Sequence, residues 1–366
     1  MLAYIIPTRD RPWHLAHTLA AIAALPPHDA QVIIVDNASS IPPTVPLRLS
    51  NDIPVELILN TRNEGAAARN RAASVADASC EWLVMLDDDS APLSANFLDA
   101  LRAQPADVLA LAAEIHLTSA AREAGGLPEV FIGCGAAVRR HAFLSAGGYD
   151  PSFNYYAEEY DLAAKLLLAG GRVALDRQFQ VAHRKVPGGR DMNTILRRLV
   201  RNNSWVMQRY APDHLRREEV RRVAARYASI AAREQALPGY AAGIAEWLTS
   251  VRAQPRSPMP MPLFDRFTGL AEARASLQRS FSERPFSSAF LIDRGKNDHV
   301  IEFALIELGV SIADAPDDAD VIVPGSMSPG PLLDSFQSRA HLRSAIRLVS
   351  PWRALTGEPP LLRQAA

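Results

Sequence analysis

The chain has 366 residues, of which 48% are hydrophobic and 22% are charged, and it is long enough for two or three globular domains. It contains 19 glycines and 27 prolines, too few for a collagen-like or low-complexity chain. The formal net charge of -1 provides no overall field for nucleic acid or anionic lipid. We therefore expect no nucleic-acid partner.

Cysteine content and the N-terminus indicate the compartment. Cys80 and Cys134 are too few for a disulfide framework, and no metal-like Cys/His spacing surrounds them. The apolar run at residues 2–7 is too short for a secretory leader, and no run of about 18 apolar residues predicts a membrane-spanning helix. These features predict a reducing, cytoplasmic setting.

Strand and helix patterns alternate in the first hundred residues. Short apolar runs predict strands at residues 2–7, 32–35, 55–59 and 82–86. Alanine-rich stretches predict helices at 13–25 and 64–76. This order predicts a parallel sheet covered by helices. Polar residues follow every one of the four strands, at the edge where such sheets bind their ligands.

The rest of the chain also shows recognisable elements. The predicted elements are helices at 94–103 and 157–169, a strand at 108–115, two basic amphipathic helices within 184–233, and strand, helix and strand at 289–293, 299–308 and 321–324. Proline occupies four of the eight positions from 255 to 262, which predicts a linker.

An acidic triplet directly follows the fourth predicted strand. Asp87 and Asp89 stand two residues apart at the ligand edge of the sheet, and their oxygens are hard ligands that suit Mg²⁺ or Mn²⁺. Taken alone, the triplet favours an acidic turn or a helix cap. The neighbouring polar strand ends shift the interpretation to a metal site beside a diphosphate.

Asp36 follows the second predicted strand, where a carboxylate can accept hydrogen bonds from a ribose or a nucleobase. The alternative is a loop cap within residues 36–39. No G-x-G-x-x-G motif follows the first strand, and the chain has no P-loop. A nicotinamide or flavin cofactor is therefore not expected.

Seven short motifs, in order and at compatible spacing, resemble glycosyltransferase family 2 with its GT-A fold. They lie at residues 5–12, 32–39, 63–71, 86–89, 133–139, 147–150 and 158–162, and His183 follows them. The resemblance spans roughly residues 1–210. It implies an α/β fold with a mostly parallel sheet and helices on both faces, followed here by a helical region and a small C-terminal α/β unit.

This resemblance implies an inverting transferase that uses a nucleotide-diphospho-sugar, with a UDP-sugar favoured, and Mn²⁺ or Mg²⁺. The residues that it places at the donor are Thr8, Arg9, Asp36, Asn63, Arg69, Asp87 and Asp88. Asp89 of the D-x-D motif is the implied metal ligand, and His183 matches a histidine that approaches the metal or phosphate. A partly buried histidine at a strand end is the alternative for His183.

The predicted helix at 157–169 is expected to supply the catalytic base. The family usually has Glu-Asp there, whereas this chain has Glu158 and Glu159. Glu159 lies at the helix start, where free backbone N–H groups favour an ionised carboxylate. Asp161 is the alternative base, although it lies near the apolar stripe of the helix and residues two apart point to different faces.

We divide the chain into a GT-A-like catalytic domain (1–210), a helical extension (211–254), a proline-rich linker (255–284) and a small α/β unit of unknown role (285–366). Removal of everything after the linker start is expected to leave the nucleotide site intact. The turn at 325–330 follows a strand and is interpreted as a proline-stiffened loop, with a phosphate cradle as the alternative.

The expected acceptor is a hydroxyl of a carbohydrate, a lipid-linked sugar or another compound. The basic helices within 184–233 favour a solvated face, with contact to a lipid phosphate at a membrane surface as the alternative. An oligomer is compatible with the sequence.

Two other functions compete with glycosyl transfer. A sugar-phosphate nucleotidyltransferase would share the sheet and carboxylates, but it needs a glycine-rich loop after the first strand, and residues 7–11 contain no glycine. A non-catalytic nucleotide-sugar-binding protein would not need the intact acidic residues.

Overall fold

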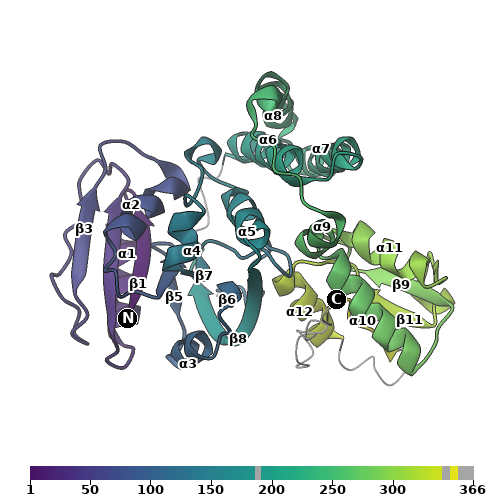
Figure 1. Cartoon of the computed structure of the whole chain (residues 1–366), viewed down its shortest axis with the longest axis horizontal. Coiled ribbons are helices and arrows are strands. Elements are labelled where there is room, and N and C mark those ends of the chain that lie inside the picture. Colours follow the sequence, from purple (N-terminus) through teal and green to yellow (C-terminus); the bar gives the residue numbers. More distant parts are fainter. Residues whose placement is uncertain (186–190, 340–346, 353–366) are drawn as a thin grey trace.

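The structure is a computed structural model that describes residues 1–185, 191–339 and 347–352. Its larger sheet has the strand order β3-β2-β1-β4-β7-β6-β8-β5 (Figure 1). The parallel half consists of β1 (Leu2–Thr8), β2 (Ala30–Asp36), β3 (Val55–Leu59) and β4 (Trp82–Leu86). These are the four strands predicted from the apolar runs.

The other half of the sheet mixes strand directions. It consists of β5 (Ser90–Pro92), β6 (Val108–Leu117), β7 (Gly135–Arg139) and β8 (Arg172–His183). β7 runs antiparallel between β4 and β6, and β8 is parallel to β6 but antiparallel to β5. Because His183 pairs with Ser90, the end of β8 lies directly beside the acidic triplet.

Helices cover both faces of this sheet, as predicted. Tyr4 and Ile6 of β1 belong to a core that includes α1 (Pro12–Ala23) and α3 (Asn96–Arg102). Ile5 faces the other side, where the covering helices are α2 (Ala68–Val75), α4 (Arg140–Ser145) and α5 (Glu158–Leu168). The alternation follows from the two-residue period of a strand.

Three helices form a separate bundle with its own small core. They are α6 (Met192–Tyr210), α7 (Arg216–Arg233) and α8 (Leu237–Ser250) (Figure 1). α8 crosses α6 so closely that a Cβ on Gly239 would lie 2.1 Å from the Asn193 carbonyl oxygen. Part of the basic face is paired, since Glu246 of α8 binds Arg197 and Arg201. Within the described ranges, no helix has the length and apolarity needed to cross a membrane.

The segment expected as a linker contains two helices instead, α9 (Met261–Thr268) and α10 (Leu270–Glu283). The proline content led to the wrong expectation, because Pro262 lies in the first turn of α9, where the missing N–H costs nothing. No proline follows between 263 and 283.

The C-terminal unit is a small α/β layer, as predicted. Its strands are β9 (Ser288–Ile292), β10 (Ser311–Ile312), β11 (Val321–Pro324) and β12 (Arg347–Leu348), all parallel in the order β10-β9-β11-β12, with helices α11 (Asp298–Glu307) and α12 (Pro329–Ser338). Short 3₁₀ turns occur at Gly65–Ala67, Pro151–Phe153, Val251–Ala253 and Pro316–Asp318.

Removal of the chain after Ala253 is expected to destabilise the remainder, in contrast to the expectation from sequence. One buried cluster runs from Ile5 through Phe267, and Arg266 binds the Glu129 carboxylate at 2.6 Å. Leaving Glu129 unpaired and its surroundings exposed costs about 3 kcal/mol or more. Thermal unfolding of the two chains tests this, and a soluble truncated chain with an unchanged Tm would contradict it.

Candidate functional site

The site lies where the first four strands end. Thr8 and Asp36 are register partners at the ends of β1 and β2, and both are buried. The backbone continues this line, because Asn37 N–H donates to the Thr8 carbonyl at 2.8 Å and Asn60 N–H donates to the Asp36 carbonyl at 2.9 Å. The polar strand ends predicted from the sequence thus lie side by side.

Asp88, the middle residue of the acidic triplet, points inward. Its carboxyl accepts a hydrogen bond from Thr8 Oγ1 at 2.8 Å and pairs with Arg11 Nη1 at 2.7 Å. Burial raises the pKa of Asp88 to about 7, and the Arg11 charge and the Thr8 hydroxyl only partly oppose this. Through its hydrogen bond with Thr8, Asp88 connects the end of β1 to the acidic triplet.

Asp89 lies between two cationic groups. Arg11 Nη2 is 2.5 Å from its Oδ2 atom, and His183 Nε2 is 3.3 Å from its Oδ1 atom. Burial alone would raise the pKa of Asp89, but the bonds from His183 and Arg11 outweigh it and hold the pKa well below its usual range. Asp89 is thus an ionised carboxylate next to a histidine.

His183 is held from both sides of its ring. Glu123 Oε2 lies 2.8 Å from Nδ1, opposite the Asp89 contact at Nε2. Burial would lower the pKa of His183, but its bonds to Asp89, Cys134 and Glu123 raise that pKa to about 12. The sequence placed His183 at the metal, and the structure brings it to Asp89.

Asp87 faces outward from the triplet. Its side chain is 40% exposed and pairs with Arg69 of α2, which is itself buried and also donates to the Leu86 carbonyl at 3.1 Å. The Asp87 carboxylate is therefore the member of the triplet most accessible to a ligand.

A metal ion fits the donor atoms gathered here. Asp87, Cys134 and His183 each offer a ligand atom, and these three atoms lie within 4.8 Å of one another. Burial raises the pKa of the Cys134 thiol to about 11, so the sulfur is a poor anionic ligand. His183 would have to give up its Nε2 proton before that nitrogen could bind a metal ion. The nitrogen and the carboxylate oxygens of Asp87 and Asp89 would then make a mixed oxygen and nitrogen set, which suits Mn²⁺ better than Mg²⁺.

Among the described residues, three that were predicted at the donor make mostly short-range contacts, although Asn63 also forms a hydrogen bond with the Tyr155 side chain. The Asp36 carboxylate accepts from Ser39 N–H at 3.2 Å, which is the loop cap considered as its alternative. Asn63 Oδ1 accepts from Gly65 N–H at 2.9 Å. Arg9 is exposed, and its guanidinium lies 3.5 Å from the carboxylate of its neighbour Asp10. This pair does not involve the acidic triplet.

The start of α5 brings two glutamates to the other side of the site. Glu159 is half-buried, and its Oε1 atom accepts from Gly133 N–H at 3.1 Å. Glu158 is buried, and among the described residues its Oε2 atom has no hydrogen-bond partner. Burial raises the pKa of both carboxyls, well above the ordinary value for Glu158.

Asp161 is fully buried and bound on several sides. Its carboxylate pairs with Arg209 at 2.8 Å and with Lys165 at 2.8 Å, and it accepts from Tyr210 hydroxyl at 2.7 Å. These contacts tie α5 to the end of α6. The geometry therefore gives Asp161 a bracing role and leaves Glu159 as the accessible acid.

Several residues of the site were not singled out from the sequence. Arg11, Glu123, Cys134 and Lys296 come from four separate segments, and only the fold brings them to the site. The ammonium nitrogen of Lys296 lies 4.1 Å from the centre of the Tyr160 ring, directly after Glu159. No local signal marks a contact between residues so distant in sequence; Cys134 and His183 are 49 positions apart yet lie 3.6 Å from each other.

Comparison with known families gives one match in the first part of the chain. Residues 4–116 match glycosyl transferase family 2, the family that the motifs resemble. The matched segment runs from β1 into β6 of the larger sheet. The match ends near the C-terminal end of β6, and His183 and α5 follow it in the chain. No curated protein sequence matches the chain.

Two solved structures are similar to this chain over most of its length. S. aureus TarS 1–349 in complex with UDP-GlcNAc has a TM-score of 0.51 and 12% identity, over 84% of this chain and 92% of that one. A mannosyltransferase from Pyrobaculum calidifontis in complex with GDP-Man and Mn²⁺ has a TM-score of 0.44 and 18% identity, over 84% and 86%. At these identities the TarS likeness shows the fold, which is the expected GT-A fold.

GalNAc-T7 with UDP, GalNAc and Mn²⁺ is matched over 58% of this chain at 15% identity and a TM-score of 0.48. The match covers 48% of that chain, so this protein corresponds to about half the length of GalNAc-T7.

Proposed function

We propose that this protein is an inverting glycosyltransferase that moves a sugar from a nucleotide-diphospho-sugar to an acceptor hydroxyl. The observation that carries the proposal is the meeting of Asp87, Asp89 and His183 at the strand ends beside a family 2 domain. A UDP-sugar is the favoured donor, and TarS, which shares the fold, was solved with UDP-GlcNAc.

The donor is proposed to lie along the ends of β1 to β4. Asp36 and Asn63 would face the nucleoside, with Thr8 and Arg9 at the end of β1. Arg69, which is held by the Leu86 carbonyl and Asp87, would orient the Asp87 carboxylate toward the ribose or sugar.

Asp89 and His183, with Asp87, are the residues proposed to hold a divalent metal ion. When bound there, such an ion would neutralise charge that develops on the departing diphosphate. Arg11 pairs with both Asp88 and Asp89, so its positive charge partly balances the negative charge of these two buried carboxylates. Mn²⁺ is favoured over Mg²⁺ because the site includes a histidine nitrogen.

Glu159 is proposed as the catalytic base. It would take the proton of the acceptor hydroxyl while that oxygen bonds to the sugar carbon and the bond from this carbon to the diphosphate oxygen breaks. The Gly133 N–H bond fixes one carboxylate oxygen and leaves the other for the acceptor. Glu158 is the more deeply buried of the two acids, and burial raises its pKa well above the ordinary value, which favours its protonated form.

Turnover is expected to fall on the acid side at a pH above the ordinary glutamate range. Burial raises the pKa of Glu159, and a base works only when ionised, so activity is lost as the pH drops through that raised pKa. A pH profile at saturating donor measures the acid limb. An acid limb at or below about pH 4.3, the value of an ordinary glutamate, would contradict the assignment.

Product analysis distinguishes the competing functions. The protein is incubated with a panel of UDP- and GDP-sugars, with water or simple sugars as acceptors, and release of nucleoside diphosphate is measured. Release that depends on Glu159 supports a glycosyltransferase. Pyrophosphate release from a nucleoside triphosphate and a sugar phosphate would indicate a nucleotidyltransferase, and binding without turnover of any donor would favour a non-catalytic protein.

The acceptor is proposed to be a hydroxyl of a carbohydrate or lipid-linked sugar. Both cysteines are free and buried, which fits a reducing compartment, and the proposal places the protein in the cytoplasm.

A further inference from the structure

We infer that the C-terminal unit fixes the orientation of His183 through the loop at residues 122–126, with Glu123 as the positioning residue. The inference rests on the proposed function in one respect, since His183 is taken as a metal ligand. Three observations support it.

The first set joins Glu123 to the histidine. Glu123 Oε2 is 2.8 Å from His183 Nδ1, and Glu123 Oε1 is 2.7 Å from Lys185 Nζ. The Glu123 carboxylate is buried, and its backbone N–H donates to the Ile115 carbonyl at 2.9 Å. A carboxylate that accepts from one ring nitrogen leaves the other nitrogen aimed in a fixed direction, here toward Asp89.

The second set joins the same loop to α12. Asp334 of α12 receives two bonds from Arg122, from the backbone N–H at 2.8 Å and from the guanidinium at 2.5 Å. Ser328, just before α12, accepts from Gly125 N–H at 3.0 Å and donates to the Gly125 carbonyl. Two residues of the C-terminal unit thus hold the loop on both sides of Glu123.

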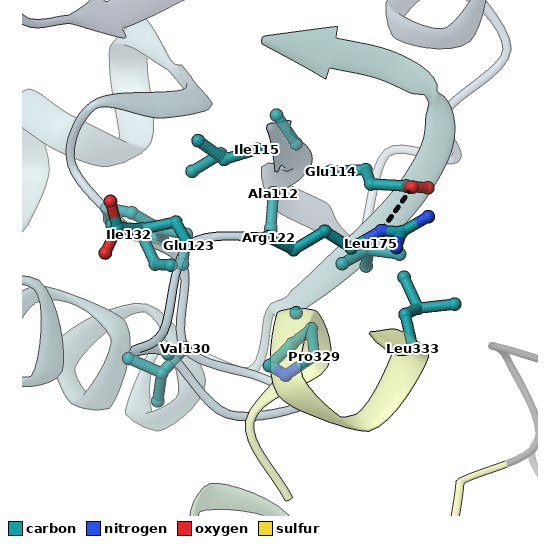
Figure 2. Close-up of a pocket in the computed structure, with 14 residues that line it drawn as sticks. Ala112, Glu114, Ile115, Arg122, Glu123, Val130, Ile132, Leu175, Pro329 and Leu333 are labelled. Atoms are coloured by element: carbon teal, nitrogen blue, oxygen red, sulfur yellow. Dashed lines mark hydrogen bonds and ion pairs between the residues drawn. The ribbon is translucent and has the colours of Figure 1, made fainter. Parts of the chain in front are cut away.

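The third observation is close packing at Glu123 itself. A Cβ on Gly330 would lie 2.3 Å from the Glu123 carbonyl oxygen and 2.9 Å from the Arg122 side chain. Figure 2 shows Pro329 and Leu333 of α12 directly below Arg122. The cavity left between the two units is about 20 Å³, room for about one water, so the loop is packed closely against α12.

This arrangement also accounts for the turn at 325–330. The Ser328 hydroxyl is hydrogen-bonded to the Gly125 backbone, and Gly330 contacts the loop at residues 122–126. Residues 325–328 form a loop at the contact between the two units, whereas Pro329 and Gly330 begin α12, so the expected proline-stiffened loop at 325–330 is only partly a loop.

A set of variants in the full-length chain tests the inference. Glu123→Gln removes the carboxylate that holds His183, and Asp334→Asn weakens the clamp on Arg122. Glu129→Gln is the matched control, because Glu129 binds Arg266 of α9 at 2.6 and 2.7 Å, in the stretch that leads to the C-terminal unit, and lies outside the loop at 122–126. Thermal unfolding confirms that each variant is folded.

Two readouts are measured on each variant. The first is Mn²⁺ affinity in the presence of UDP, by electron paramagnetic resonance of free Mn²⁺. We expect Glu123→Gln to weaken it about 10- to 100-fold, Asp334→Asn to weaken it less, and Glu129→Gln to leave it unchanged. The second is the protection of the His183 Nδ1 proton from exchange with solvent, measured by NMR of ¹⁵N-histidine protein. The His183→Gln variant assigns the signal. We expect the protection to fall in Glu123→Gln and Asp334→Asn but not in Glu129→Gln.

The two readouts separate this inference from the proposed metal dependence. If the wild type binds no Mn²⁺ but the His183 proton responds as expected, the positioning holds and the metal assignment fails. If folded Glu123→Gln and Asp334→Asn leave the His183 proton unchanged, or if Glu129→Gln changes it equally, the C-terminal unit does not position His183.

Discussion

Replacement of Glu159 with glutamine is expected to lower turnover about 10²- to 10⁴-fold and to leave donor affinity unchanged. Glutamine preserves the size of the side chain and its hydrogen bond from Gly133, but it cannot take a proton from the acceptor. Single-turnover rates and donor affinity by calorimetry separate these two effects.

Two neighbouring acids serve as controls for the Glu159 variant. Glu158→Gln mimics the protonated form that burial favours, so most turnover should remain. Asp161→Asn disturbs the buried pairs with Arg209 and Lys165, so its main effect should be a loss of stability of about 3 kcal/mol. An active Glu159→Gln together with a folded but inactive Glu158→Gln or Asp161→Asn would move the base to the other residue.

Replacement of Asp89 with asparagine should remove most turnover in a protein that still folds. Stabilisation of the departing diphosphate by a metal ion is worth several kcal/mol, which corresponds to a loss of about 10²-fold or more. If Asp89 only caps a turn, asparagine would replace it at a cost of about 1 kcal/mol in stability with little kinetic effect. Turnover and Tm of the variant decide between the two.

Asp88→Asn is the comparison within the same triplet. The Asp88 carboxyl points inward to Thr8 and Arg11. We therefore expect Asp88→Asn to lower Tm more than it lowers turnover. Near-full activity of Asp89→Asn would contradict the D-x-D assignment.

The sequence could predict the parts of the site that depend on local pattern. The four parallel strands are short apolar runs, and their polar ends lie at one sheet edge because parallel strands share a direction. Thr8, Asp36 and the acidic triplet were found in this way. The helix that carries Glu159 was found from its spacing and from Gly170 at its end.

The contacts that complete the site depend on distant pairings. His183 reaches Asp89 because β8 pairs with β5 in one particular register, and no local pattern encodes that register. Glu123 and Asp334 are far apart in sequence, and the proline-rich stretch between the two units obscured the helices that join them. The sequence assigned the base to Glu159 with Asp161 as the alternative, and only the fold shows that Asp161 and Glu158 are both buried.

The most direct test of the account is calorimetric titration of UDP into the full chain with Mn²⁺ and, separately, with EDTA. The account predicts binding that depends on the metal ion in the wild type and is strongly weakened in Asp89→Asn, because Asp89 and His183 are proposed to hold an ion that would neutralise the diphosphate. UDP binding of equal affinity in Mn²⁺ and EDTA, or no binding of any nucleotide or nucleotide sugar under either condition, would contradict it.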